Sequence, residues 1–560
     1  MNTSYSHGVS DRPLLGETIG GCLDAVAAKF PNNEALVSTF ENVRLTYAQF
    51  RAEVDRLARA LMALGLQKGD RVGIWSTNCA AWVLTQFATA KTGVVLVNIN
   101  PAYRLHELEY ALKQSECHGL ILGAGFKDAD YAAMLRELVP GLAAADAMQD
   151  LRCEKFPHLR RCVSLCAEPG PGFLPWPGLL ALAQDVAPEA LAARQASLDF
   201  DDVINIQYTS GTTGFPKGAM LTHLGLLNNG HWVSGRMRLT HRDRLCIPVP
   251  FYHCFGMVLG NLACVSQGAT MVIPAPHFSP IATLDAVQRE RCTALHGVPT
   301  MFIAQLDHPR FREFDLSTLR TGIMAGAPCP VEVMKRVMNE MHCREITIAC
   351  GMTETSPVCN MTEVDDPLEI RCGTVGRVMP HQEQKIVDPA SGALLPRGEH
   401  GELCYRGHQV MRGYYNSPDA TRSAIDPAGW MHSGDLAVMD ELDYVKITGR
   451  LKDMICRGGE KIFPREVEEF LFTHPKIAEA YVIGVPDRYY GENVVAWVKC
   501  KEGCGLTSEE LRAFCRGRIM DYKIPQHVKF VTEFPSTVTG KVQKFRMREV
   551  STQEIAQATK

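Results

Sequence analysis

A glycine- and hydroxyl-rich segment with a single lysine, residues 208–223, constrains the fold of this chain more than any other part of the sequence. It reads Tyr-Thr-Ser-Gly-Thr-Thr-Gly-Phe-Pro-Lys-Gly-Ala-Met-Leu-Thr-His. The apolar run 203–208 before it predicts a buried strand, and residues 221–229 after it predict the beginning of a helix. Glycines permit tight turns with accessible backbone N–H groups, and the lysine adds a positive charge. A strand, such a loop and a helix together predict a cradle for a polyphosphate.

The order of residues in this loop separates two interpretations. A Walker A loop needs a glycine, four residues and then Gly-Lys-Ser/Thr, which the order Gly214-Phe-Pro-Lys217-Gly218 does not match. A generic surface loop is the simpler alternative. The Ser/Thr run followed by Gly-Phe-Pro-Lys-Gly, however, resembles the phosphate-binding loop of the adenylate-forming (AMP-binding) superfamily, which includes acyl-CoA synthetases, amino-acid adenylation domains and luciferases. The resemblance implies that ATP is bound by Thr209, Ser210, Gly211, Thr212, Thr213, Gly214 and Lys217, with Thr213 also a ligand of Mg²⁺.

Composition and charge exclude several other classes of protein. The 560 residues suffice for two or more domains, and 46% hydrophobic with 21% charged residues is ordinary for a globular protein. The formal net charge of −4 gives no indication of a nucleic-acid surface. No run approaches 18 uninterrupted apolar residues, and the N-terminal residues do not resemble a secretory signal, so no transmembrane segment is expected.

The high cysteine count indicates buried thiols rather than a disulfide framework. The 20 cysteines are scattered and include no Cys-x-x-Cys pair. The closest pairs, Cys162/Cys166 and Cys500/Cys504, have no second pair at zinc-site spacing. We therefore expect no disulfides, no structural metal, and a reducing compartment, the cytoplasm.

The pattern of apolar runs predicts a large α/β domain followed by a smaller one. Residues 46–64 have helical spacing, and the short apolar runs 71–75, 93–97, 119–122 and 269–273 alternate with helical segments, as in parallel sheets covered by helices. Residues 168–178 are too rich in Pro and Gly for a helix or strand. From about residue 373 short β-like runs predict a small β-rich subdomain, and the last hundred residues predict a compact α+β domain, which the resemblance implies is mobile. It would contain helices at 464–472 and 508–520 and strands at 480–483 and 494–498. The predicted boundaries are 1–449, a hinge at 450–452, and 453–560.

A second motif, Pro-Phe-Tyr-His-Cys-Phe-Gly at residues 250–256, contains the candidate histidine His253. A lone histidine in such a segment is more often a helix cap or a core residue than a functional group. In the resembling superfamily, the matching histidine lies beside the acyl-carboxylate site, so the resemblance implies that role for His253, with Cys254, Phe255 and Gly256 lining the acyl side.

Two further segments resemble the superfamily's adenine and magnesium motifs. The resemblance assigns the small-residue turn Gly326, Ala327 and Pro328 to the adenine base, together with Cys350, Gly351 and Met352. The hydroxyl of Thr353 would bind phosphate. Glu354 would supply the hard oxygen ligand that Mg²⁺ takes together with phosphate oxygens. The superfamily usually has an aromatic residue where this chain has Cys350, so we expect weaker ATP binding or a compensating neighbour.

The C-terminal part contains three further matches. The resemblance assigns Asp435 and Arg450 to the ribose and phosphate oxygens, and it makes Lys452 the hinge about which the small domain rotates. Gly458 and Gly459 would allow close approach of the pantetheine arm of coenzyme A. The order Thr-Gly-Lys-Val-Gln-Lys at 539–544 is typical of the superfamily's adenylation lysine, here Lys541, although a basic solvated tail is the simpler alternative.

The resemblance extends from about residue 18 to residue 548 and is strongest to the medium-chain fatty acyl-CoA synthetase branch. It implies an ATP-dependent fatty acid–CoA ligase that forms an acyl adenylate with release of pyrophosphate, then transfers the acyl group to coenzyme A with release of AMP. Small-molecule carboxylate, ATP, Mg²⁺ and coenzyme A are the expected partners, and the oligomeric state, including a homodimer, is left open. Three alternatives remain: an aryl-CoA ligase, an acyl-AMP ligase that loads a carrier protein, and a non-catalytic nucleotide- or acyl-binding protein.

Overall fold

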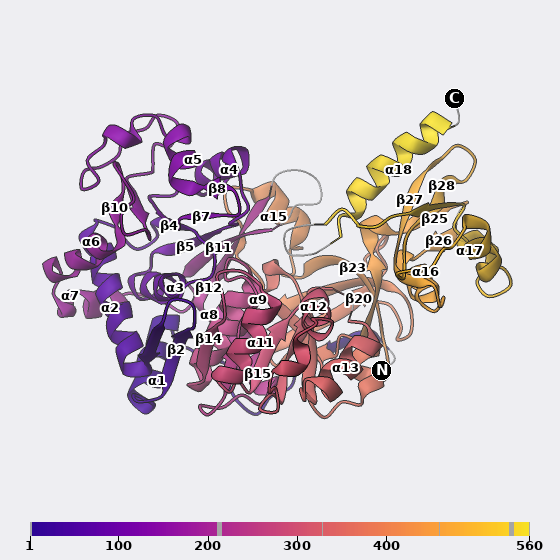
Figure 1. The fold of residues 1–560 in the computed structure, drawn as a ribbon, viewed down its shortest axis with the longest axis horizontal. Coiled ribbons are helices and arrows are strands. Elements are labelled where there is room, and N and C mark those ends of the chain that lie inside the picture. Colours follow the sequence, from indigo (N-terminus) through magenta and orange to yellow (C-terminus); the bar gives the residue numbers. More distant parts are fainter. Residues whose placement is uncertain (1–2, 210–215, 328, 459, 537–541, 559–560) are drawn as a thin grey trace. The chain divides into compact units, whose positions relative to one another are not determined.

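The structure is a computed structural model that describes residues 3–209, 216–327, 329–458, 460–536 and 542–558 (Figure 1). The chain divides into two compact units. The large unit comprises Ser6–Glu383 and Tyr405–Met431, and the small unit comprises Met1–Tyr5, Gln384–Cys404 and His432–Lys560. The predicted boundary at residue 449 and the predicted hinge at 450–452 remain predictions, because compactness alone does not show where a chain rotates.

The first sheet of the large unit has eight strands in the order β10–β9–β6–β4–β5–β11–β12–β22. Neighbours from β10 to β11 run parallel, whereas β12 and β22 are antiparallel additions. Its central strands are continuous apolar runs because helices cover both faces of the sheet. The strands are β4 (Arg71–Trp75), β5 (Val95–Ile99), β6 (Gly119–Leu122), β9 (Arg161–Ser164), β10 (Leu174–Pro175), β11 (Val203–Thr209), β12 (Lys217–Thr222) and β22 (Gly413–Tyr414).

The second sheet of the large unit has nine strands in the order β19–β18–β17–β16–β15–β13–β14–β2–β3. The strands from β17 to β2 are parallel to their neighbours, and the two ends of the sheet are antiparallel. The strands are β2 (Glu34–Ser38), β3 (Val43–Thr46), β13 (Arg244–Cys246), β14 (Thr270–Ile273), β15 (Ala294–Gly297), β16 (Thr321–Ala325), β17 (Glu345–Gly351), β18 (Val358–Met361) and β19 (Arg377–Val378).

Helices cover both sheets (Figure 1), and the buried apolar residues between these layers form three hydrophobic cores. One core joins inward-facing residues of both sheets with α2 (Tyr47–Ala63), α3 (Ala80–Thr92) and α8 (His223–Arg236). The opposite face of the nine-stranded sheet packs on α11 (Pro280–Arg289), α12 (Pro299–Leu306) and α13 (Val331–Glu340). The opposite face of the eight-stranded sheet packs on α4 (Leu105–Ser115) and α5 (Tyr131–Leu138). The α/β class predicted from the alternating apolar runs is therefore confirmed.

Local sequence signals account for several of these elements. Thr46 caps α2 through a capping box with Gln49, and the left-handed Gly65 (φ 84°) follows its end, as the pattern at 46–64 predicts. The runs 71–75 and 119–122 are β4 and β6 with the predicted bounds.

One predicted helix begins two residues later than expected, and one segment expected to be irregular contains a short strand and a helix. Residues 217–222 form strand β12, so the helix α8 begins only at His223, because this segment pairs along its whole length with β11. Residues 174–181, part of the segment expected to be irregular, form β10 and the short helix α6 (Trp176–Ala181). Pro177 is tolerated in the first turn of α6 because backbone N–H groups there have no partner within the helix.

The small unit holds most of a five-stranded sheet in the order β1–β20–β21–β23–β24, and a second sheet in which β26, β25, β28 and β27 follow one another and β29 pairs with β28. The second sheet packs α16 (Pro464–Phe472) and α17 (Ser508–Cys515) in one core and α18 (Lys544–Ala558) in another, which confirms the α+β prediction. Helix α17 ends five residues before the predicted residue 520, since Gly517 is left-handed (φ 70°). The strands are β1 (Tyr5–His7), β20 (Gln382–Val387), β21 (Gly401–Gly407), β23 (Met431–Met439), β24 (Val445–Arg450), β25 (Ile455–Arg457), β26 (Glu460–Ile462), β27 (Ile477–Asp487), β28 (Gly491–Cys500) and β29 (His527–Phe530).

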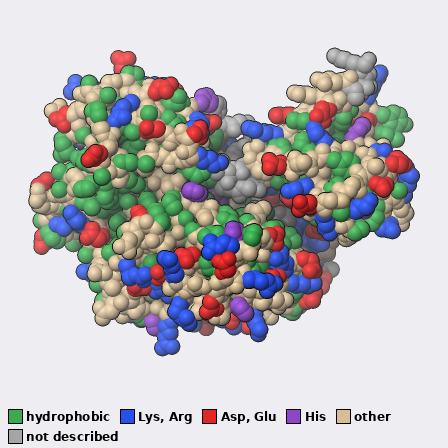
Figure 2. Space-filling view, in the orientation of Figure 1, with side chains coloured by type: hydrophobic (Ala, Val, Ile, Leu, Met, Phe, Trp, Pro, Cys, Tyr) green, Lys and Arg blue, Asp and Glu red, His purple; other side chains and the backbone are tan. Residues whose placement is uncertain are grey.

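The surface and the thiols match the ordinary composition. Basic and acidic side chains are mixed on the face that Figure 2 shows, as the net charge of −4 suggests. All twenty cysteines are free thiols, and eleven of them are buried. Among the described residues, no helix combines the length and apolar character that crossing a bilayer requires.

Candidate active site

The antiparallel strands β11 and β12 of the eight-stranded sheet flank the predicted phosphate loop in the sequence. Thr209 ends β11 and lies directly opposite Lys217, the first residue of β12. Gly218 is needed next to the lysine, since a Cβ there would lie 2.8 Å from a methyl group of Ile206. The Lys217 ammonium lies 5.1 Å from the centre of the Tyr414 ring, within the range of a cation–π contact. The loop residues Ser210, Gly211, Thr212, Thr213 and Gly214 lie outside the described residues.

Glu354 is buried beside these two strands, and Tyr414 contacts both Glu354 and Lys217. The Glu354 side chain is only 7% exposed, and its Oε1 accepts a 2.7 Å hydrogen bond from the Tyr414 hydroxyl. Its backbone carbonyl accepts a hydrogen bond from the Met411 amide. Burial, and then the charge of Glu354, raise the pKa of Tyr414 well above its ordinary value, so the phenol stays neutral and donates. The Tyr414 hydroxyl thus holds one oxygen of the Glu354 carboxylate, while the ring of the same tyrosine contacts the Lys217 ammonium.

The predicted adenine segments lie together because they follow neighbouring parallel strands. Strands β16 and β17 are paired, with Ala325 opposite Ala349, so their carboxyl ends reach the same edge of the nine-stranded sheet. Gly326 and Ala327 are exposed just after β16, and Gly326 requires glycine for its φ of 87°. Ligands of open α/β sheets bind beyond such edges. The structure brings this turn next to Cys350, Gly351, Met352 and Thr353; Pro328 lies outside the described residues.

His253 is exposed and caps the short helix α9 (Cys254–Gly256). Its Nδ1 accepts a 3.3 Å hydrogen bond from the Phe255 amide, so the structure shows the cap that was the simpler alternative for this residue. Helix α9 lies close to Thr353 and Glu354, and both residues shift the pKa of the Cys254 thiol. Burial raises the pKa of Cys254 to about 12, a hydrogen bond to Thr353 lowers it, and the charge of Glu354 raises it. The motif at 250–256 therefore lies next to the segment that contains Glu354. The capping role of His253 does not test its predicted role beside the carboxylate of the acyl substrate, which stays a prediction.

A buried histidine that the sequence analysis did not single out lies behind this helix. His296 on β15 is fully buried, its ring centre is 5.3 Å from that of Phe255, and its Nε2 donates to the Leu259 carbonyl over 2.8 Å. Burial lowers the pKa of His296 to about 4 despite the two backbone groups that favour its charge. The residue is therefore neutral at pH 7.

This depressed pKa predicts a loss of stability in weak acid. The folded-state pKa lies below the unfolded value of about 6.5, so the contribution of His296 is complete above pH 6.5 and declines as the pH falls toward 4. At pH 5 the expected loss is about 1–2 kcal/mol of unfolding free energy. When thermal unfolding is measured at pH 7 and at pH 5, the unfolding midpoint of His296→Gln should fall less between the two pH values than that of the parent protein. The exposed His277→Gln serves as the control and should shift as the parent does; equal shifts for all three proteins would contradict the assignment.

The small unit places Asp435 and Arg450 opposite each other on the antiparallel strands β23 and β24. Arg450 Nε lies 3.2 Å from Asp435 Oδ1, and both side chains remain partly exposed. A carboxylate and a guanidinium held side by side present acceptors and donors to a ribose diol. The predicted pair is therefore brought together, and its role in nucleotide binding stays a prediction.

The remaining predicted residues of the small unit lie just beyond this pair. Lys452 is exposed in a 3₁₀ turn, Leu451–Asp453, between β24 and β25. Gly458 has a φ of 60° at the turn between β25 and β26, where a Cβ would come within 3.3 Å of the Tyr490 ring. Gly459 and Lys541 lie outside the described residues.

Tyr414 is the residue that motif reasoning missed. It lies sixty positions from Glu354 in a two-residue strand, and the surrounding Arg-Gly-Tyr-Tyr-Asn carries no spacing that links it to a carboxylate. Only the pairing of β12 with β22 brings the hydroxyl to the site.

Comparison with known proteins supports a single family over nearly the whole chain. Residues 23–415 match the AMP-binding enzyme family, and residues 466–541 match the AMP-binding enzyme C-terminal domain. A putative acyl-CoA synthetase of Bacillus subtilis, YngI, is 50% identical over 96% of this chain and 97% of its own length. The mitochondrial medium-chain acyl-CoA ligase ACSF2 of Bos taurus is 43% identical over 99% of this chain and 90% of its own length.

Solved structures agree with the sequence matches. ATP-bound MatB from Rhodopseudomonas palustris superposes with a TM-score of 0.81 at 28% identity, covering 95% of this chain and 99% of that one. A fatty acyl-CoA synthetase of Mycobacterium tuberculosis gives a TM-score of 0.73 at 28% identity, covering 96% and 99%. The family matches over most of the chain and the 50% identity to a relative of nearly the same length agree with the fold described above. The chain belongs to the AMP-binding enzyme family.

Proposed function

We propose that this protein is an ATP-dependent fatty acid–CoA ligase that prefers medium-chain acids. The observation that carries the proposal is the buried Glu354 carboxylate, held by Tyr414 beside the β11–β12 hairpin and the Lys217 charge. A buried carboxylate and a lysine ammonium that both contact Tyr414 suit a nucleoside triphosphate whose phosphates arrive with a divalent cation. The names of the relatives, a medium-chain acyl-CoA ligase and an acyl-CoA synthetase, support the choice of substrate.

In the first half-reaction, a carboxylate oxygen of the acid attacks the α-phosphorus of ATP, and the bond to pyrophosphate breaks. Lys217 and Lys541 would offset the negative charge on the phosphates, and Asp435 with Arg450 would hold the ribose. Glu354 and Thr213 would hold Mg²⁺, and the donor set fits because hard carboxylate and hydroxyl oxygens are what this cation prefers. When bound, Mg²⁺ supplies screening of the phosphate charge. His253 would border the acid.

In the second half-reaction, the thiol of coenzyme A attacks the acyl carbonyl, the bond to AMP breaks, and the thiol proton leaves to solvent. AMP is a far better leaving group than hydroxide, which is the reason for the first step. Lys452 would allow the rotation between the two poses, and Gly458 with Gly459 would admit the pantetheine arm. The twenty free thiols support a reducing compartment, the cytoplasm, which fractionation would test.

The deciding experiment measures pyrophosphate and AMP release over a panel of straight-chain acids from C2 to C18 and aromatic acids, with and without coenzyme A. The proposal expects acid-dependent pyrophosphate, AMP release accelerated by coenzyme A, and the highest kcat/KM for medium-chain acids. A preference for aromatic acids would indicate an aryl-CoA ligase. Pyrophosphate formation that ignores coenzyme A would indicate loading of a carrier protein. No acid-dependent release at saturating ATP would leave a binding protein.

The ribose assignment makes a separate prediction. Asp435→Ala is expected to raise the KM for ATP by about 10–100-fold, because a charged hydrogen bond to the nucleotide contributes about 1.5–3 kcal/mol, while the KM for the acid should stay within about twofold. Steady-state kinetics with each substrate varied in turn measures this. Glu441→Ala, an exposed carboxylate in the same hairpin, is the matched control and should behave as the parent. A rise in both KM values together would point to disruption of the hairpin instead.

A further inference from the structure

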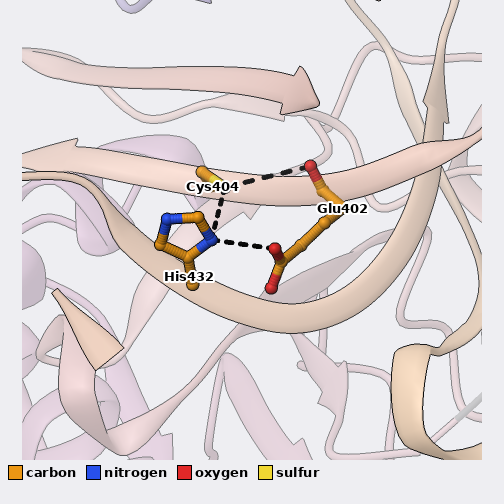
Figure 3. A group of neighbouring side chains, drawn as sticks. All are labelled: Glu402, Cys404 and His432. Carbon is orange, nitrogen blue, oxygen red and sulfur yellow. Dashed lines mark hydrogen bonds and ion pairs between the residues drawn. The ribbon is translucent and has the colours of Figure 1, made fainter. Parts of the chain in front are cut away.

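Three metal-ligating side chains of the small unit converge on one face of its first sheet (Figure 3). Glu402 and Cys404 are two residues apart on β21, so their side chains point to the same face of the strand. His432 lies on β23, the neighbouring strand in the sheet. The ligand atoms of all three residues lie within 4.8 Å of one another.

The His432 ring faces both partners through the same nitrogen. Its Nδ1 is 2.8 Å from Glu402 Oε2 and 3.5 Å from the Cys404 sulfur. Cys404 is fully buried and Glu402 nearly so, whereas the His432 side chain is 33% exposed. The cluster is thus closed by protein on two sides and open to solvent on the histidine side.

We propose that Glu402, Cys404 and His432 form a Zn²⁺-binding site with three protein ligands and a fourth position open to water or a small ligand. Sulfur, imidazole nitrogen and carboxylate oxygen together are the donor set that zinc takes in open sites, whereas magnesium and calcium avoid thiolates. On binding, the Cys404 sulfur forms a bond to zinc and its proton leaves to solvent. The proton of His432 moves from Nδ1 to Nε2, which frees the Nδ1 lone pair for the metal.

Two of the three distances between ligand atoms need only a small adjustment to accept the ion, and the third, between the sulfur and the carboxylate oxygen, is within 4.8 Å. Tetrahedral bonds of about 2.3 Å to sulfur and about 2.0–2.1 Å to nitrogen and oxygen place nitrogen and sulfur about 3.6 Å apart, and nitrogen and oxygen about 3.4 Å apart. The nitrogen–sulfur distance of 3.5 Å already matches. The nitrogen–oxygen distance of 2.8 Å, that of a hydrogen bond, must lengthen by about 0.6 Å, which a glutamate side chain can do by rotation.

The simpler alternative is a structural Glu402–His432 hydrogen bond with no metal. That pair also organises the turn before Asp435, because Glu402 Oε1 accepts the Gly434 amide hydrogen at 3.2 Å. In this alternative the Cys404 thiol is only a weak hydrogen-bond donor, to the Glu402 carbonyl over 3.9 Å, whereas the zinc site requires its thiolate. The cysteine therefore discriminates between the two interpretations. A search by Cys-x-x-Cys spacing could not find this set, since its members come from two strands far apart in the sequence.

The test uses Co²⁺ and Zn²⁺ titrations of the full chain. Co²⁺ should produce the thiolate charge-transfer absorption and the visible bands of a tetrahedral site, and Zn²⁺ should abolish both by displacement. Cys404→Ser should lose the thiolate band and bind Zn²⁺ at least about tenfold more weakly in competition with a chromophoric chelator. The double variant Cys500→Ser/Cys504→Ser removes two neighbouring thiols of the same unit that lie outside the proposed site. It should keep the parent's spectrum and affinity.

Each other outcome overturns the proposal. An unchanged thiolate band in Cys404→Ser, or its loss in the double variant, would assign the metal to adventitious thiols. Absence of any tetrahedral Co²⁺ spectrum in the parent would leave only the hydrogen-bonded pair. If Cys404→Ser fails to fold, His432→Asn at the exposed side is used instead; it keeps the thiol, so the expected result is weaker Zn²⁺ binding and loss of the visible bands of a tetrahedral site. Because the spectra do not depend on turnover, the outcome is independent of the proposed ligase activity.

Discussion

Lys541→Ala is expected to lower acid-dependent pyrophosphate release by about 10²–10³-fold, with little change in the KM for ATP. The lysine's charge would act on the negative charge that develops as the carboxylate attacks phosphorus, and removal of one such electrostatic contact typically costs this much in kcat. The second half-reaction, measured by supplying preformed acyl adenylate and coenzyme A, should proceed at close to the parent rate, since its charge develops elsewhere.

The exposed Lys501→Ala, in the same C-terminal region, controls for the loss of a positive charge and should keep both half-reactions. Equal losses in both half-reactions of Lys541→Ala would indicate a general effect on the C-terminal domain. Full pyrophosphate release would return the segment 534–548 to the alternative of a basic tail.

Glu354→Gln is the second change with a large expected effect. The amide has nearly the same shape and can still accept the Tyr414 hydroxyl, but it lacks the negative charge that would hold the cation arriving with ATP. We expect a loss of about 10²-fold or more in kcat/KM for Mg·ATP, with part of the loss restored at high Mg²⁺ concentration. The unfolding midpoint should not fall, because removing a buried charge relieves desolvation.

Tyr414→Phe separates the charge from its orientation. It keeps the Glu354 carboxylate and removes one 2.7 Å hydrogen bond, so the expected loss in kcat/KM is about tenfold, smaller than that of Glu354→Gln. Initial rates of pyrophosphate release over a range of Mg²⁺ concentrations measure both variants. An equal or larger loss in Tyr414→Phe would mean that the hydroxyl itself contacts the substrate, and an unimpaired Glu354→Gln would remove the carboxylate from the nucleotide site.

The parts of the fold that could be predicted are those with a local cause. Continuous apolar runs predicted β4 and β6 with their observed ends, and the helical spacing of residues 46–64 predicted α2 to within one residue at each end. The differences from prediction had mixed causes: Pro177 and Gly517 act locally at α6 and α17, whereas β12 has a non-local cause. Residues 217–222 carry no strong alternation, and they become strand β12 because β11 and β22 pair with its two edges. Local propensity gives way where such pairing satisfies the backbone.

The same distinction holds for the site. The sequence by itself determined the family, the α/β class and the candidate residues Lys217, Glu354, Asp435 and Arg450, because their motifs are short and each depends on neighbours along the chain. Only the tertiary structure decided that Tyr414 fixes the Glu354 carboxylate, and that Glu402, Cys404 and His432 share one face of a sheet. These contacts join residues far apart in sequence. Their positions follow from strand order and register, which the hydrophobic cores and backbone pairing set for the whole fold together.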